Sequence, residues 1–231
     1  MTVAEKVAEK EKNEVKAVFD KVYLLLEAEY GDLKWWPAET PYEVMLGAIL
    51  TQNTNWKNVE RAIDNLKEAD CITADAVDAV AIEKLAELIR PSGYFNIKAD
   101  RIKNFNSWYL VNGQYLQLSK IDTEKLRKML LSINGVGHET ADDILLYAFD
   151  RPVFVIDAYY RRVFSRIGIV TKKSSYEHLR LHAQQHIKQD VKLYNQYHAL
   201  LVEHCKKICK VKPVCHNCVL RKKGICKYIT E

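Results

Sequence analysis

The chain has 231 residues, of which 48% are apolar, and it carries a net charge of only +5. It has room for one large or two small domains with a packed core, and its eight glycines and five prolines argue against a turn-rich all-β fold. No apolar run approaches the length of about eighteen residues that a membrane-spanning helix needs, which excludes that class of protein. Six cysteines without an export signal predict free thiols in a reducing cytoplasm.

Apolar residues recur at the spacing of an α-helix along most of the chain. The clearest stripes are, in chain order, Trp56-Val59-Ile63-Leu66, Leu85-Leu88-Ile89, Leu126-Met129-Leu130-Ile133 and Ile144-Leu145-Ala148. Helix starts are marked by a capping box at residues 40–43, with Pro41 at the first helical position, and by Ser174-x-x-Glu177. The strand-like run at residues 153–156 is too short and isolated to build a sheet. The pattern predicts an all-α fold of about ten short helices.

Five of the six cysteines lie between Cys205 and Cys226. Four of them have the spacing Cys209-x5-Cys215-x2-Cys218-x7-Cys226. Four thiolates this close can hold one soft metal centre, either a [4Fe–4S] cluster or zinc, whereas disulfides suit a small secreted chain. Cys205 stands one helical turn before Cys209 and could replace it as a ligand. We favour Cys209 because Pro213 then falls within a tight loop between the first two ligands.

Positive charge is concentrated in the same segment, which has no Asp or Glu between Glu203 and Glu231. Its basic residues are Lys206, Lys207, Lys210, Lys212, Arg221, Lys222, Lys223 and Lys227. Such a surface is typical of proteins that meet a phosphate backbone, and Lys210 and Lys212 are the contacts we expect first. The alternative is a solvated face, which is the usual meaning of a charge run.

A glycine-rich turn, Gly135-Val136-Gly137, lies between two of the helical stripes. Two glycines in this spacing allow positive φ angles and leave backbone N–H groups bare at the start of the next helix. That arrangement can bind a phosphate without reading base sequence, although an ordinary turn between two helices gives the same residues.

Residues 135–141, the run Val155-Ile156-Asp157 and the four-cysteine tail, in this order, resemble the endonuclease III group of helix-hairpin-helix (HhH-GPD) DNA glycosylases. Thr51-Gln52-Asn53 and residues 93–99 are similar to that group's two DNA-wedge loops. The resemblance implies two helical lobes beside a base-binding cleft. One is a six-helix barrel lobe at residues 39–152 that contains the helix-hairpin-helix. The other joins residues 1–38 to residues 153–231 and carries the metal cluster.

The resemblance also implies a cofactor and a partner. It favours a [4Fe–4S] cluster on Cys209, Cys215, Cys218 and Cys226 over zinc, although the first cysteine gap is one residue shorter and the last two longer than in the commonest cluster spacing. The partner is double-stranded DNA containing a damaged base. The protein is expected to be a cytoplasmic, nucleoid-associated monomer without a membrane partner.

The family's essential aspartate falls on Asp157, whose carboxylate would stabilise positive charge on the sugar and orient a water. Asp157 could equally cap a helix, and the two roles can coexist. Glu139 stands where bifunctional members carry a Schiff-base lysine, so the resemblance implies a monofunctional enzyme. The 3-methyladenine DNA glycosylase III branch, which acts on alkylated purines, has Glu at this position. Glu139 is therefore expected in the base pocket, unless it is a solvated residue of the helix's first turn.

Aromatic residues complete the predicted site. Trp35, Trp36 and Pro37, with Trp56, are expected to stack on the flipped base, because aromatic faces attract cationic alkylated purines. The alternative is that these tryptophans belong to the core. Gln52 and Tyr94 would fill the hole left by the base and wedge the opposite strand, unless they are ordinary loop and core-edge residues.

Three other functions remain open on the sequence. The first is a glycosylase for oxidised pyrimidines or mismatches, with possible abasic-site lyase activity. The second is a non-catalytic, metal-stabilised DNA-binding protein. The third is a redox module that uses the cluster for electron transfer, against which the lysine-rich flanks and the phosphate-binding turn argue.

Overall fold

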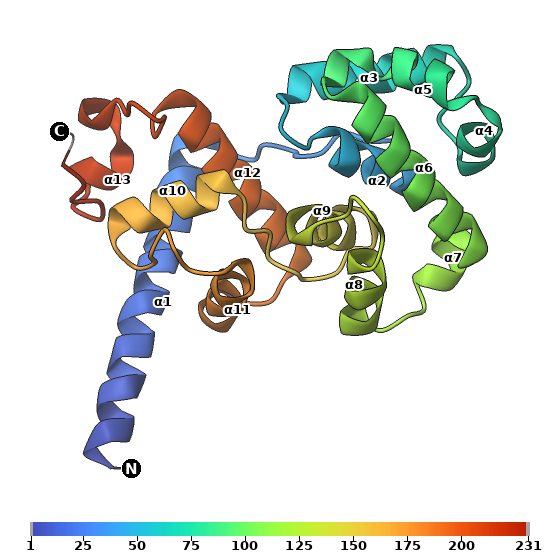
Figure 1. Cartoon of the computed structure of the whole chain (residues 1–231). Helices are drawn as coiled ribbons and strands as arrows, with labels where there is room; N and C mark the ends of the chain where they lie inside the picture. The colour runs from blue at the N-terminus through green and yellow to red at the C-terminus, as the bar shows by residue number, and fades with distance from the viewer. Residues whose placement is uncertain (1, 230–231) are drawn as a thin grey trace. The chain divides into compact units, whose positions relative to one another are not determined.

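The computed structural model describes residues 2–229, without the side chains of residues 3, 4 and 6–8. No β-strand occurs in this part of the chain, and thirteen α-helices are found in it, which confirms the predicted all-α fold (Figure 1). The number of helices exceeds the expected one, and five of them have seven residues or fewer, namely α4 (Ala74–Ala79), α5 (Ile82–Leu88), α7 (Gln114–Leu118), α9 (His138–Asp143) and α13 (Val219–Lys222). None of the helices within residues 2–229 has the length and apolar character to cross a membrane.

The chain divides into two compact units, one of which is Trp36–Arg151 and the other the residues up to Trp35 together with those from Pro152 onward. The unit that joins the residues up to Trp35 to those from Pro152 onward is here called the discontinuous unit. It contains α1 (Val3–Tyr30), α10 (Ala158–Ile167), α11 (Tyr176–His186), α12 (Val191–Lys207), a 3-10 turn (Cys215–Asn217) and α13 (Val219–Lys222). The continuous unit contains α2 (Pro41–Leu50), α3 (Trp56–Glu68), α4 (Ala74–Ala79), α5 (Ile82–Leu88), a 3-10 turn (Arg90–Ser92), α6 (Phe95–Val111), α7 (Gln114–Leu118), α8 (Thr123–Leu131), α9 (His138–Asp143) and a π-helical turn (Ile144–Ala148).

The core of the discontinuous unit is aromatic. α1 packs along α12, and α10 packs against the same helix. Phe164 of α10 lies 4.7 Å from Phe19 of α1 between ring centroids, and Tyr197 of α12 meets Phe154 edge-on at 5.8 Å. The run at residues 153–156 that looked strand-like is buried here in extended, unpaired form, so its apolar character reflects burial in a core of helices.

The continuous unit is built around α2, in which every residue after Pro41 is buried. α2 packs against α3, α6, α9 and the π-helical turn, and α6 also contacts α4 and α5. The helix begins as the sequence predicted, because Thr40 accepts a hydrogen bond from the backbone N–H of Glu43 and Pro41 takes the first position. The start of α2 thereby anchors residues 36–40, the segment that precedes the helix in the continuous unit.

The predicted helix start at Ser174 is wrong by one residue. Ser175 is the cap of α11 and accepts from the backbone N–H of His178, whereas the hydroxyl of Ser174 lies 2.9 Å from that of Thr171. Either of the two adjacent serines could cap the helix, but the hydroxyl of Ser174 forms a hydrogen bond within the preceding turn, which leaves Ser175 as the cap.

Candidate functional site

Asp157 lies at the N-terminus of α10 and uses its two carboxylate oxygens differently. Oδ1 accepts a hydrogen bond of 2.7 Å from the backbone N–H of Tyr160, so Asp157 caps the helix. Oδ2 lies 3.3 Å from Nε2 of His198 on α12, and each of the two side chains is only 8% exposed. The helix-cap interpretation is therefore correct, and it leaves the second oxygen for another role. His198 was not identified from the sequence, in which it stands 41 residues away.

Trp35 belongs to the same discontinuous unit as Asp157. Its ring meets the ring of His198 edge-on, with centroids 6.4 Å apart. The ammonium of Lys206 lies 5.3 Å above the centroid of Trp35. Trp35, predicted for the base pocket, is thus half-buried beside the partner of Asp157, and one of the tail's lysines covers it.

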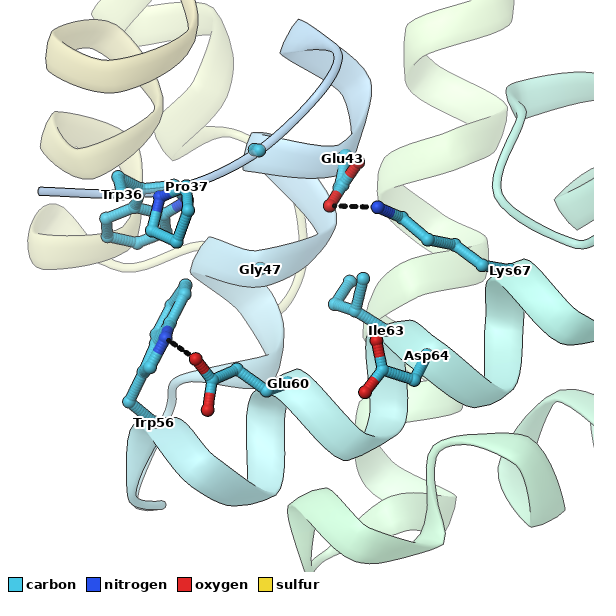
Figure 2. Close-up of a pocket in the computed structure, with 10 residues that line it drawn as sticks. Trp36, Pro37, Glu43, Gly47, Trp56, Glu60, Ile63, Asp64 and Lys67 are labelled. Atoms are coloured by element: carbon cyan, nitrogen blue, oxygen red, sulfur yellow. Dashed lines mark hydrogen bonds and ion pairs between the residues drawn. The ribbon is translucent and has the colours of Figure 1, made fainter. Parts of the chain in front are cut away.

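The continuous unit contains a pocket of about 160 Å³ between α2, α3 and residues 36–38 (Figure 2). Three of the four residues predicted for the base pocket line it, namely Trp36, Pro37 and Trp56. The ring of Trp36 stacks on Tyr147 at 4.6 Å between centroids and meets Trp56 nearly edge-on at 5.1 Å. Gly47 faces the same ring, since a β-carbon at this position would lie 3.5 Å from the indole of Trp36, at ordinary van der Waals distance.

One face of α3 supplies polar groups to this pocket. Figure 2 shows Glu60 beside Trp56, with its carboxylate accepting a hydrogen bond of 2.8 Å from the indole nitrogen. Asp64, one turn further on, also lines the pocket. Lys67 follows, and its ammonium lies 3.0 Å from the carboxylate of buried Glu43. Glu60, Asp64 and Lys67 were not identified from the sequence, although their spacing from Trp56 puts all four residues on one helix face.

Lys67 also meets a second carboxylate. Its ammonium lies 2.8 Å from Glu39, and this hydrogen bond lowers the pKa of Glu39. The hydrogen bonds that Lys67 donates to Glu39 and Glu43 raise the pKa of Lys67. Glu39 and Glu43 thereby balance the positive charge of Lys67. The other two acidic residues that line the pocket, Glu60 and Asp64, are exposed.

Glu139 lies in the first turn of α9 and is exposed. It is not among the residues that line the pocket of Trp36 and Trp56. Its position at a helix N-terminus agrees with the alternative interpretation of a solvated acidic residue. Its placement in a base pocket stays a prediction.

The glycine-rich turn joins α8 to α9 as a helical hairpin. Gly135 has φ +95°, and a β-carbon there would lie 2.2 Å from Cγ of Arg101, so only glycine fits. Val136 is buried, whereas Gly137 caps α9 and nothing lies within 4 Å of the place where its β-carbon would be. The hairpin therefore presents an open backbone at the start of α9, as expected for a phosphate contact.

Gln52 connects its loop to this hairpin. Its amide nitrogen donates to the backbone oxygen of Gly135 at 3.0 Å and to Oγ1 of Thr140 at 2.9 Å. Its amide oxygen accepts from the guanidinium of Arg101. To enter a duplex, as predicted, Gln52 would have to exchange these hydrogen bonds for others.

Tyr94 precedes α6 in a left-handed conformation, with φ +47°, and 69% of its side chain is exposed. Nearby, Lys98 is 1% exposed and donates to the backbone oxygens of Leu50 at 2.8 Å and of Ser92 at 2.7 Å. Burial lowers the pKa of Lys98 to about 8. Lys98 thus ties the loop that carries Gln52 to the turn that carries Tyr94, a role that the sequence did not reveal.

The four predicted cysteine ligands lie in the discontinuous unit. Cys209 and Cys218 are buried and Cys215 and Cys226 half-buried. A hydrogen bond from Cys205 lowers the pKa of Cys209, assisted by the guanidinium of Arg166, which is 3.0 Å from its sulfur. Burial raises the pKa of Cys218 and of Cys226, and the charge of Cys209 contributes to both shifts.

These thiols lie close enough to influence one another, but among the described residues no group of three or more His, Cys, Asp or Glu side chains is arranged around a single metal ion. Cys205 is buried near Cys209, and its Sγ lies 3.8 Å from the backbone oxygen of Tyr159.

The loop between Cys209 and Cys215 presents its lysines outward. Arg166 of α10 donates to the backbone oxygens of Lys210 at 2.8 Å and Val211 at 3.0 Å. The side chains of Lys210 and Lys212 are exposed. The backbone of the loop is thereby fixed while its positive charge faces solvent, which suits a phosphate contact.

Comparison with known proteins identifies the family. The model of the HhH-GPD superfamily of base excision DNA repair proteins matches residues 46–189. A candidate DNA repair glycosylase of Methanocaldococcus jannaschii is 50% identical over 204 residues, covering 87% of this chain and 93% of that protein. Endonuclease III of Sulfolobus acidocaldarius is 35% identical over 192 residues, covering 82% of this chain and 83% of that protein.

Solved structures agree. The 3-methyladenine DNA glycosylase of H. pylori, bound to 1,N6-ethenoadenine, matches with a TM-score of 0.69 and 28% identity over 85% of this chain and 97% of that one. An endonuclease III–DNA complex matches with a TM-score of 0.76 over 94% of this chain and 95% of that one, and at 21% identity it shows the shared fold. The chain therefore belongs to the HhH-GPD superfamily of base excision DNA repair proteins, as a DNA glycosylase of that family.

Proposed function

We propose that this protein is a monofunctional DNA glycosylase that hydrolyses the N-glycosidic bond of alkylated purines in duplex DNA. The observation that carries the proposal is the pocket of Trp36 and Trp56, which the carboxylates of Glu60 and Asp64 also line. A methylated purine such as 3-methyladenine in DNA carries positive charge, which both aromatic faces and carboxylates attract. The similarity to a 3-methyladenine DNA glycosylase solved with an ethenoadenine supports the same class of lesion.

Asp157 is the proposed catalytic residue. As the bond between sugar and base breaks, positive charge develops on the sugar and the bonding electrons leave with the base. The carboxylate of Asp157 would stabilise that charge and accept a proton from the water that attacks the sugar carbon. A cationic base leaves readily, so one carboxylate suffices without strong protonation of the leaving group.

Glu139 supports the monofunctional assignment. A lyase needs an amine that attacks the sugar and forms a Schiff base. The residue at this position is a carboxylate, and its neighbour His138 is not a substitute amine. The enzyme is therefore proposed to leave an intact strand with an abasic site.

Double-stranded DNA is the proposed partner. The hairpin at Gly135 and Gly137 and the exposed Lys210 and Lys212 would hold the phosphate backbone, with Gln52 and Tyr94 at the site of the flipped base. Cys209, Cys215, Cys218 and Cys226 would hold a [4Fe–4S] cluster, whose role at this site is to fix the basic loop. We propose a monomer that works in the cytoplasm, at the chromosome.

Base release from a panel of damaged duplexes tests the proposal. Released bases are identified by chromatography after incubation with the parent protein and with Asp157→Asn. Free 3-methyladenine or another methylated purine is expected from the parent only, because Asp157→Asn keeps the shape of the side chain and removes its charge. A protein that binds abasic DNA but releases no base from any lesion would instead be a non-catalytic DNA-binding protein.

The second candidate is a glycosylase for oxidised pyrimidines or mismatched thymine. The 35% identity to an endonuclease III and the 27% identity to a thymine/uracil-DNA glycosylase of Pyrobaculum aerophilum favour it. The same panel of damaged duplexes separates the two candidate functions, because the identity of the released base shows which class of lesion the enzyme acts on.

A further inference from the structure

We propose that His198 is a positioning residue for the glycosylase reaction, which holds the carboxylate of Asp157 in the correct orientation. This inference rests on the proposed function, and it concerns a residue that no sequence motif marks. The observation behind it is the distance of 3.3 Å between Nε2 of His198 and Oδ2 of Asp157.

Burial makes this contact specific. Both side chains are 8% exposed, so water competes poorly for either partner and the hydrogen bond is stronger than at a surface. The other carboxylate oxygen is fixed by the backbone N–H of Tyr160 at 2.7 Å. With one oxygen held by the start of α10 and the other by α12, the plane of the carboxylate is determined by two helices.

The roles of donor and acceptor follow from the chemistry. An ionised carboxylate accepts hydrogen bonds only, so Nε2 of His198 must carry the proton. The edge of Trp35 against the imidazole restricts the rotation of His198 around this hydrogen bond. Trp35 therefore contributes to the site through His198, which gives a physical reason for its half-buried position.

The orientation of the Asp157 carboxylate matters in the proposed reaction. The water oxygen bonds to the sugar carbon, the bond to the base breaks, and one water proton passes to the carboxylate of Asp157. The hydrogen bond from His198 holds Oδ2 in one place, so the carboxylate keeps a single orientation toward that water.

Two amide substitutions separate a positioning role from a structural one. Gln places its amide nitrogen near the position of Nε2, whereas Asn, shorter by one methylene, cannot reach Oδ2. His198→Gln should keep the single-turnover rate of base release within about threefold of the parent. His198→Asn should lose about tenfold to a hundredfold, the range of one hydrogen bond to a charged group. Lesion binding should be similar in both variants, and Lys192→Asn on the exposed face of α12 serves as the control.

A double-mutant cycle then tests whether His198 acts through Asp157. In the Asp157→Asn background, His198→Asn should cause no further loss of rate. An additive loss would overturn the inference, as would equal rates in His198→Asn and the parent. An equal fall in rate and melting temperature in both amide variants would also overturn it, because His198 would then be structural. A parent protein that releases no base would instead contradict the proposed function itself.

Discussion

The indole nitrogen of Trp56 donates a hydrogen bond of 2.8 Å to the carboxylate of Glu60, one turn further along α3. The bond fixes the orientation of an aromatic wall of the pocket and places negative charge at its edge. Trp56 is half-buried, so part of its ring remains accessible. The pair therefore supports a ligand that is both planar and cationic.

Glu60→Gln should separate these two contributions, because the amide oxygen can still accept from Trp56 while the charge is lost. Single-turnover excision of a cationic methylated purine should fall about twofold to fivefold, as expected for one exposed charge. Excision of neutral 1,N6-ethenoadenine should not change. Glu68→Gln, at the exposed end of the same helix, is the control. An equal loss for both lesions would show that charge plays no part.

Lys98→Met should change the pH dependence of stability. The pKa of Lys98 is lowered from 10.5 to about 8 in the folded protein, so between these values the unfolded chain binds more protons. The free energy of unfolding therefore gains a contribution from Lys98 that rises with pH from about 8 to 10.5. Denaturant titrations across this window should show the rise in the parent and in Lys57→Met, an exposed control, but not in Lys98→Met. If the free energy of unfolding changed with pH in the same way in the parent, Lys57→Met and Lys98→Met, the lowered pKa of Lys98 would be contradicted.

The same substitution should also lower stability at neutral pH. Met leaves the backbone oxygens of Leu50 and Ser92 without their donor, at a cost of about 1–3 kcal/mol for each buried group. The loops of Gln52 and Tyr94 should become more mobile, which hydrogen exchange of their amides can measure.

Iron analysis tests the four-cysteine site. Cys218→Ser should lose iron and sulfide together with solubility, because a hydroxyl is a poor ligand for the cluster. Cys205→Ser should keep iron, since the serine hydroxyl can still donate to Cys209. Stoichiometric zinc without iron in the parent would contradict the cluster, and loss of iron in Cys205→Ser would make Cys205 a ligand.

The salt dependence of DNA binding tests the basic loop. Each phosphate contact contributes about −0.9 to the slope of log K against log salt. Changing Lys210 and Lys212 to Glu should flatten that slope without altering lesion preference. Lys12→Glu on α1 is an exposed control that should leave the slope unchanged. A slope unaffected by the loop substitutions would place the DNA surface elsewhere.

The sequence predicted the all-α fold and several local features well, because these depend on near neighbours. The cap at Thr40, the cap at Asp157 and the positive φ at Gly135 all follow from patterns a few residues long. The hydrogen bond from Trp56 to Glu60 could also have been predicted, since the two stand one helical turn apart.

Relationships between distant residues could not be predicted. The contact of Asp157 with His198 spans 41 residues and depends on how α10 packs on α12. The buried role of Lys98 depends on two carbonyl groups that only the folded chain brings together. Trp35 and Trp36 were treated as one aromatic pair, yet they belong to different compact units. Trp36 has φ +66°, a left-handed turn of the backbone that helical periodicity does not reveal.

The most direct test of the account is a comparison of two duplexes that differ in one base, 3-methyladenine in one and an oxidised pyrimidine in the other. Under single-turnover conditions with borohydride present, the account predicts release of free 3-methyladenine, an intact abasic strand and no covalent protein–DNA adduct. Release of the oxidised pyrimidine alone, or efficient trapping of the protein on DNA, would contradict it.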